Sequence, residues 1–251
     1  MTRIEQYLHE TRTPVYTVLY VLPLFLVYEF LALTLHTFQI TTLRNGADVM
    51  LRNMAAVFGL NNFPAMIFGI LVILAIIAGY YKKKHQIEIT GGFFVLMFAE
   101  SILYSLMMGS LALSMTNFFL NIPNAFALSL SITSTDFWVN IMLSFGAGIH
   151  EEFFFRLILI TGLLELAKLV SKNNATNLLS WNTLFALLAS SVIFSYSHYI
   201  GDFGEAIRLD SFLFRMVSGL YLSVIYLFRG FGVSAWTHAL YDVFLLTGFL
   251  D

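Results

Sequence analysis

The sequence predicts an all-α protein, a multi-pass transmembrane bundle of about seven helices, or eight. Apolar residues make up 59% of the 251 positions and charged residues 11%, whereas soluble domains are about one quarter charged. The apolar residues also gather in runs of about 20, the length that a helix needs to cross the hydrocarbon core of a bilayer. The chain therefore belongs with integral membrane proteins.

Seven segments are apolar and long enough to span a membrane: residues 14–38, 64–81, 92–118, 137–165, 176–200, 212–229 and 232–250. The loop RGFG at 229–232 is so short that the count is open by one span, and the side on which the C-terminus lies is open with it. Residues 40–56 are mixed in polarity and predict a helix at the membrane interface. Neither a repeat nor a low-complexity tract divides the chain, so residues 1–251 are expected to form a single membrane domain.

Positive charge predicts the orientation, because lysine and arginine gather in cytoplasmic loops. With the cluster Lys82–Lys84 placed inside, eight of the 13 basic residues fall on the cytoplasmic side. The N-terminus is then cytoplasmic. The first 13 residues are charged throughout and lack an apolar core, so a cleaved signal peptide is not expected.

Composition also excludes several function classes. The net charge is −2 and no basic stripe is interleaved with aromatic residues, so no nucleic-acid partner is expected. Cysteine is absent, which excludes disulfides, thiol nucleophiles and cysteine-type zinc sites.

The stretch GIHEEFFFR at 148–156 places several polar side chains within the fourth predicted span. A charge at the bilayer centre costs about 2.5–3.5 kcal/mol on insertion scales, so such residues are usually paired, cavity-facing or functional. Glu152 and Arg156 are four residues apart and can pair on one helix face. Glu151 is rotated by about 100° from Glu152. One interpretation gives Glu152 and Arg156 a structural role and Glu151 a chemical one. The other joins all three in one ion-pair network that holds the bundle together.

Two more predicted spans carry histidines. His198 ends the segment FSYSH, where a lone histidine is more often an interfacial side chain than a functional one. His238 and Asp242 in HALYD share a helix face, and an aspartate can orient an imidazole ring through a hydrogen bond. The alternative is a polar pair that satisfies only itself. Together, the three clusters supply one glutamate and two histidines, a set that recurs in hydrolases.

The motifs EEFFFR, FSYSH and HALYD, taken in order, match the pattern E-E-x-x-x-R, F-x-x-x-H and H-x-x-x-N/D. This pattern resembles the CAAX protease and bacteriocin-processing family of intramembrane proteases, which includes the Ras-converting CAAX endopeptidases. The resemblance covers about residues 137–250, which would carry the protease core.

The resemblance implies an all-helical membrane core around an internal hydrophilic cavity, and hydrolysis by a glutamate-activated water. By motif position, Glu151 is expected to be the general base and His198 its partner in holding the water. His238 and residue 242 are expected to stabilise the oxyanion. Glu152 and Arg156 are expected to position these groups. The family further implies a multi-pass protein of a prokaryotic cell (inner) membrane, and a membrane-embedded or lipidated peptide as substrate.

Position 242 departs from the pattern, because it is Asp where animal and archaeal CAAX enzymes commonly have Asn. An ionised aspartate cannot donate a hydrogen bond to an oxyanion, so Asp242 is expected to orient His238 or to bind a metal. Members of the family have been called metalloproteases, and four side chains offer zinc ligands: Glu151, His198, His238 and Asp242. The sequence favours a metal-free mechanism with no cofactor, and zinc remains the alternative.

Two other functions compete with the protease. A transporter would use buried carboxylates as a proton relay, with Glu29 and Glu100 on the pathway, but matching broken helices in two halves are absent from the sequence. A non-enzymatic bacteriocin-immunity or scaffold protein would share the fold. We expect Glu29 and Glu100 to be supporting residues, hydrogen-bonded inside the bundle.

The proposed site requires His198 and His238 to converge on Glu151. Drawn as straight helices, the spans place the two histidines near opposite membrane faces. A bent or re-entrant segment is therefore needed to bring them together.

Overall fold

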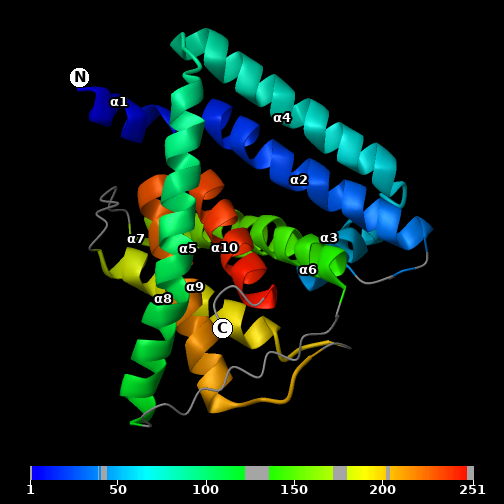
Figure 1. Ribbon diagram of the computed structural model, residues 1–251. Helices are drawn as coiled ribbons and strands as arrows, with labels where there is room; N and C mark the ends of the chain where they lie inside the picture. The colour runs from blue at the N-terminus through cyan, green and yellow to red at the C-terminus, as the bar shows by residue number, and fades with distance from the viewer. Residues whose placement is uncertain are drawn as a thin grey trace.

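The computed structural model describes residues 2–38, 40, 44–121, 136–171, 180–201 and 204–247. Within these ranges every regular element is helical (Figure 1). The all-α fold class is thereby confirmed for the part of the chain described here.

The N-terminal half contributes five helices: α1 (Arg3–Glu10), α2 (Pro14–Thr37), α3 (Gly46–Val57), α4 (Phe63–His85) and α5 (Gly91–Leu120). Helix α2 begins with proline, whose missing N–H costs nothing at a first helical position. Helices α4 and α5 each end at a residue in the left-handed conformation, Gln86 with φ of 50° and Asn121 with φ of 51°. In Figure 1, α2 and α4 run side by side, and α5 crosses the molecule beside α10.

The C-terminal half begins with one continuous helical segment over residues 137–171. It consists of α6 (Phe137–Gly146), η1 (Ala147–Glu151), η2 (Phe153–Ile160) and α7 (Thr161–Ser171), where η1 and η2 are π-helical. Then follow α8 (Trp181–Ser197), α9 (Leu209–Arg229) and α10 (Phe231–Leu246). The motif EEFFFR thus lies on wide π turns, which the sequence analysis did not anticipate.

Each of the seven predicted spans contains helix, although residues 176–179 and 248–250 lie outside the described residues. Among the described residues, four helices are long and apolar enough to cross a membrane: α2, residues 65–85 of α4, α5 and α9. Helices α8 and α10 have only 17 and 16 residues. The chain is an integral membrane protein, and the count of about seven spans and the internal cavity stay predictions.

Helix α10 packs against α2, α5, α6, α9 and η1 and so lies at the centre of the bundle. Its approach to η1 is very close, because a Cβ added at Gly148 would lie 2.5 Å from the carbonyl oxygen of Ala235. Glycine is required where two helix backbones come this near. This contact brings the segment that carries Glu151 next to the segment that carries His238.

The two isolated glutamates of the N-terminal half are ion-paired inside the bundle, as predicted. Glu29 lies 2.8 Å from Arg52, and Glu100 lies 2.8 Å from Arg229. Arg229 also donates to the side chain of Thr11 and is only 6% exposed. The structure thus buries Arg229 as the partner of Glu100.

Candidate active site

The π turns of η1 and η2 place Glu151 and Glu152 in different surroundings. Glu151 ends η1, Glu152 links the two π-helical elements, and η2 starts at Phe153. The Glu152 side chain is fully buried, while that of Glu151 is 14% exposed. Short π-helical stretches are frequent at functional sites because they redirect side chains locally.

Glu152 and Arg156 form the predicted ion pair, with Arg156 Nη1 2.8 Å from Glu152 Oε1. Arg156 is fully buried as well, its Nη2 donates to the carbonyl oxygen of Gly219 at 3.1 Å, and its guanidinium lies 4.5 Å from the centre of the Phe194 ring. Two buried charges require close pairing, because each has lost its hydration. The pair therefore joins η2 to α8 and α9 at the middle of the bundle.

Glu152 also orients His238. The Nδ1 atom of His238 lies 2.9 Å from Glu152 Oε1, and Ser234 donates its hydroxyl to Glu152 Oε2. Because a carboxylate only accepts, Nδ1 must carry a proton. The other ring nitrogen, Nε2, then faces away from Glu152.

Two carboxylates lie beside His238 Nε2. Glu151 Oε2 is 3.9 Å away and Asp242 Oδ2 is 3.7 Å away. Asp242 was expected to orient the imidazole or to bind a metal, and the hydrogen bond at Nδ1 comes instead from Glu152, on the opposite side of the ring. Asp242 instead borders the same space as Glu151.

His198 lies at the end of α8, next to these groups. Its Nδ1 is 2.9 Å from the carbonyl oxygen of Phe194, which leaves Nε2 as the nitrogen that can meet a water. Glu151 and His238 both interact electrostatically with His198. The Phe194 ring connects the two histidines, with its centre 5.0 Å from that of His198 and 6.0 Å from that of His238.

The chain turns back directly after His198. Gly201 has a φ of 88°, and the N–H of Glu205 donates to the carbonyl oxygen of His198 at 3.1 Å. His238 lies midway along α10 (Phe231–Leu246) and not at its end. The two histidines can therefore approach Glu151 although straight helices would have separated them.

The N-terminal half contributes one direct contact to Glu151. Asn45, which precedes α3, donates from Nδ2 to Glu151 Oε1 at 2.9 Å. The two residues are 106 positions apart, and Asn45 is only 8% exposed. Each oxygen of the Glu151 carboxylate thus has a neighbour, Asn45 at Oε1 and His238 at Oε2.

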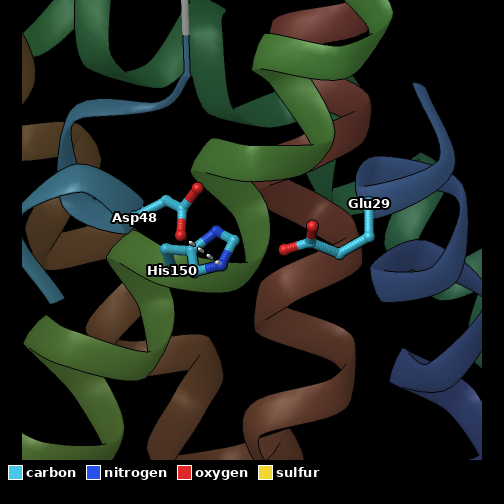
Figure 2. Close-up of side chains that lie close together, drawn as sticks. All are labelled: Glu29, Asp48 and His150. Carbon is cyan, nitrogen blue, oxygen red and sulfur yellow. Dashed lines mark ion pairs between the residues drawn. The ribbon is translucent and has the colours of Figure 1, made fainter. Parts of the chain in front are cut away.

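A second cluster lies close by. Figure 2 shows Asp48 and His150 next to each other, with Glu29 reaching toward them from α2. One potential ligand atom from each of the three lies within 4.8 Å of the others, a spacing that a metal ion could exploit. His150 Nε2 is 3.7 Å from Asp48 Oδ1, and the other ring nitrogen, Nδ1, is 3.0 Å from the carbonyl oxygen of Gly146.

Two arginines already neutralise the carboxylates of this cluster. Arg52 contacts Asp48 at 2.6 Å and Glu29 at 2.8 Å, and Arg44 contacts Asp48 at 2.9 Å. Burial opposes the charge of Asp48, but His150, the Tyr28 hydroxyl and both arginines outweigh it and lower the pKa of the carboxyl below its ordinary value. The cluster is thus an ionic anchor that fixes α3 against α2 and η1.

A zinc ion would require the predicted ligands to lie close to one another. Nitrogen and oxygen ligands lie about 2.0–2.2 Å from a tetrahedral zinc ion, so their own separations are short. Among the described residues, the group with three ligand atoms within 4.8 Å of one another is Glu29, Asp48 and His150. Within the predicted set Glu151, His198, His238 and Asp242, His238 Nε2 lies 3.9 Å from Glu151 Oε2 and 3.7 Å from Asp242 Oδ2, and zinc at these residues stays a prediction.

The sequence analysis missed three residues of this region. Asn45 caps α3, and its sequence NGAD is typical of a helix start, but nothing in it indicates a contact with Glu151. Ser234 lies one turn before His238 and donates to Glu152. His150 is adjacent to the motif but turns toward Asp48 and away from Glu151.

One protein-family model matches the part of the chain that carries the three motifs. Residues 132–244 match the family model described as type II CAAX prenyl endopeptidase Rce1-like. No curated protein and no solved structure matches the chain. The matched range contains all three motifs and nearly coincides with the segment 137–250 that carries them.

Proposed function

Because this match and the three motifs make the chain a member of the CAAX protease and bacteriocin-processing family, we propose that it cleaves membrane-associated peptides with a water activated by Glu151. The family is one of intramembrane proteases, so the reaction class is hydrolysis of a peptide bond. One observation supports the assignment to these residues above all others. Glu151 and His238 come from distant parts of the sequence, yet Glu151 Oε2 and His238 Nε2 lie 3.9 Å apart inside the bundle.

The proposed step begins with a water held between Glu151 and His198. Glu151 takes a proton from the water as the oxygen attacks the carbonyl carbon of the scissile bond. The C=O π electrons move to the oxygen and give a tetrahedral oxyanion. When the C–N bond breaks, Glu151 returns the proton to the leaving nitrogen, so the products are a carboxyl group and an amine.

His238 is proposed to stabilise the oxyanion. Glu152 fixes the ring through Nδ1, so a protonated Nε2 can donate a hydrogen bond without reorganising as the charge develops. Asp242 lies at the same nitrogen and only accepts when it is ionised, and in that state it would hold the Nε2–H in place before the substrate arrives. In this scheme Glu152 and Arg156 support the site and do not touch the substrate.

The zinc alternative makes a different prediction for chelation. In the glutamate mechanism the base is a side chain of the protein, so activity should survive exhaustive chelation. The measurement is turnover and metal content on the same chelated sample. Full activity at negligible metal content supports the proposal. Loss of activity that added zinc restores would refute it, since a bound metal would then supply the activated water.

The substrate class follows from the surroundings of the site. The carboxylates lie within a bundle that is embedded in lipid, so a scissile segment must reach them from the bilayer or its surface. We expect cleavage of hydrophobic or lipidated peptides, or of a membrane protein near the end of a helix. Incubating the purified protein with a panel of such peptides and mapping the cut by mass spectrometry tests this. Cleavage confined to soluble, unstructured peptides would contradict it.

A further inference from the structure

Asn45, the residue immediately before helix α3, lies at the candidate active site. Asn45 uses both ends of its amide: Oδ1 accepts from the N–H groups of Ala47 at 2.9 Å and Asp48 at 3.4 Å, and Nδ2 donates to Glu151 Oε1 at 2.9 Å. A capping asparagine commonly satisfies only the helix end. Here the same side chain also binds the proposed general base.

The helix that carries Asn45 is firmly attached. Arg44 and Arg52 join α3 to Glu29 of α2, and Asp48 accepts from the Tyr28 hydroxyl at 2.7 Å. Gly146 packs closely against Asn45, because a Cβ added at Gly146 would lie 2.8 Å from Asn45 Cβ. The Asn45 amide is therefore held in place from several sides.

Resting on the proposed function, we infer that Asn45 is a positioning residue that aims the Glu151 carboxylate. With Oε1 bound to Asn45, the carboxylate can rotate little, and Oε2 stays directed toward His238 and the water site. The outer face of α3 is apolar and exposed at Met54 and Val57, so α3 resembles an interfacial helix whose inner end reaches the base. Without the amide donor, Glu151 would sample rotamers that point away from the water.

Two substitutions separate this function from capping. Serine and aspartate cap helices about as well as asparagine, so Asn45→Ser and Asn45→Asp should preserve the start of α3. Neither offers a donor to Glu151: the serine hydroxyl is too short, and the aspartate places a second acceptor against the carboxylate. We expect kcat to fall by about 10²-fold in both, the loss typical of a misplaced catalytic group. KM and the thermal midpoint in detergent should change little for Asn45→Ser.

Asn62 offers a matched control. It caps α4 by accepting from the N–H of Ala65 at 3.2 Å and is exposed. Asn62→Ser and Asn62→Asp should leave kcat, KM and the thermal midpoint unchanged. Asn45→Ala, which removes both cap and donor, should lose stability in addition to kcat.

The outcomes distinguish this inference from the proposed function. If Glu151→Gln abolishes cleavage but Asn45→Ser keeps the parental kcat, Asn45 is only a cap and the inference fails alone. If kcat of Asn45→Ser falls only in proportion to the folded fraction, the inference also fails. If Glu151→Gln retains cleavage, the proposed function itself is wrong. A selective loss of kcat in a folded Asn45→Ser protein supports both.

Discussion

Replacing Glu151 by glutamine is expected to lower kcat by at least about 10²–10⁴-fold, the contribution typical of general base catalysis. Glutamine keeps the size of the side chain and can still meet Asn45, but its amide cannot take a proton from water. The fold should persist, because Glu151 belongs to no buried ion pair comparable to that of Glu152 and Arg156. Single-turnover cleavage of a peptide substrate is the measurement, with the thermal midpoint in detergent measured alongside.

Glu165→Gln is the matched control for this substitution. Glu165 lies on α7 of the same continuous helical segment, its side chain is 60% exposed, and it pairs with Lys168 at the surface. Its substitution should leave kcat unchanged. Parental cleavage by Glu151→Gln would exclude Glu151 as the base. A cellular phenotype that persists in a cleavage-dead Glu151→Ala protein would instead favour the scaffold or immunity alternative.

The pairing of Glu152 with Arg156 was predictable because its cause is local. Residues four apart meet on a helix, and two charges in an apolar segment need partners. The structure confirms the contact at 2.8 Å. The same reasoning predicted that Glu29 and Glu100 are supporting residues, although it could not choose their arginines, since those lie on other helices.

The residue that orients His238 could not be predicted from spacing within one helix. Asp242 is four residues from His238 and shares its face, so spacing favoured it as the orienting group. The structure places the fully buried Glu152 at Nδ1 and leaves Asp242 at Nε2. Glu152 and His238 are 86 positions apart, and their contact depends on how η1 packs against α10 at Gly148. The spacing of residues within one helix carries no information about that packing.

The contact of Asn45 with Glu151 was missed for a related reason. Residues 40–56 are too polar to span a membrane, so they were expected to lie at its interface and not against the motif. Helix α3 does expose apolar side chains, but its N-terminal end turns inward, with Asn45 and Asp48 both buried. The average polarity of a segment does not show which end of it is anchored.

The ion pairs also bear on the transporter alternative. A proton relay needs carboxylates that release and take up protons in turn. Glu29 and Glu100 each face an arginine at 2.8 Å, an arrangement that favours a permanently charged pair. Carboxylates paired in this way hold helices together, which argues against a proton relay through Glu29 and Glu100.

Replacing Arg156 by methionine is expected to lower the free energy of unfolding by about 3–5 kcal/mol, because it leaves the charge of Glu152 buried without its partner. Methionine fills much of the volume and retains apolar contact with Phe194, so the loss reports on the charge more than on packing. Lys168→Met removes the cation of an exposed pair and should cost at most about 1 kcal/mol. Chemical denaturation in detergent micelles measures both.

The double variant Glu152→Met with Arg156→Met isolates the cause of that loss. If an unpaired buried carboxylate destabilises the single variant, removing the carboxylate as well should recover part of the stability, since apolar replacement of a whole buried pair is often neutral or better. Cleavage should not recover, because His238 Nδ1 would have lost the carboxylate that orients it. A double variant less stable than Arg156→Met alone would show that Glu152 acts mainly through His238 and Ser234, and that Arg156 is not its principal partner.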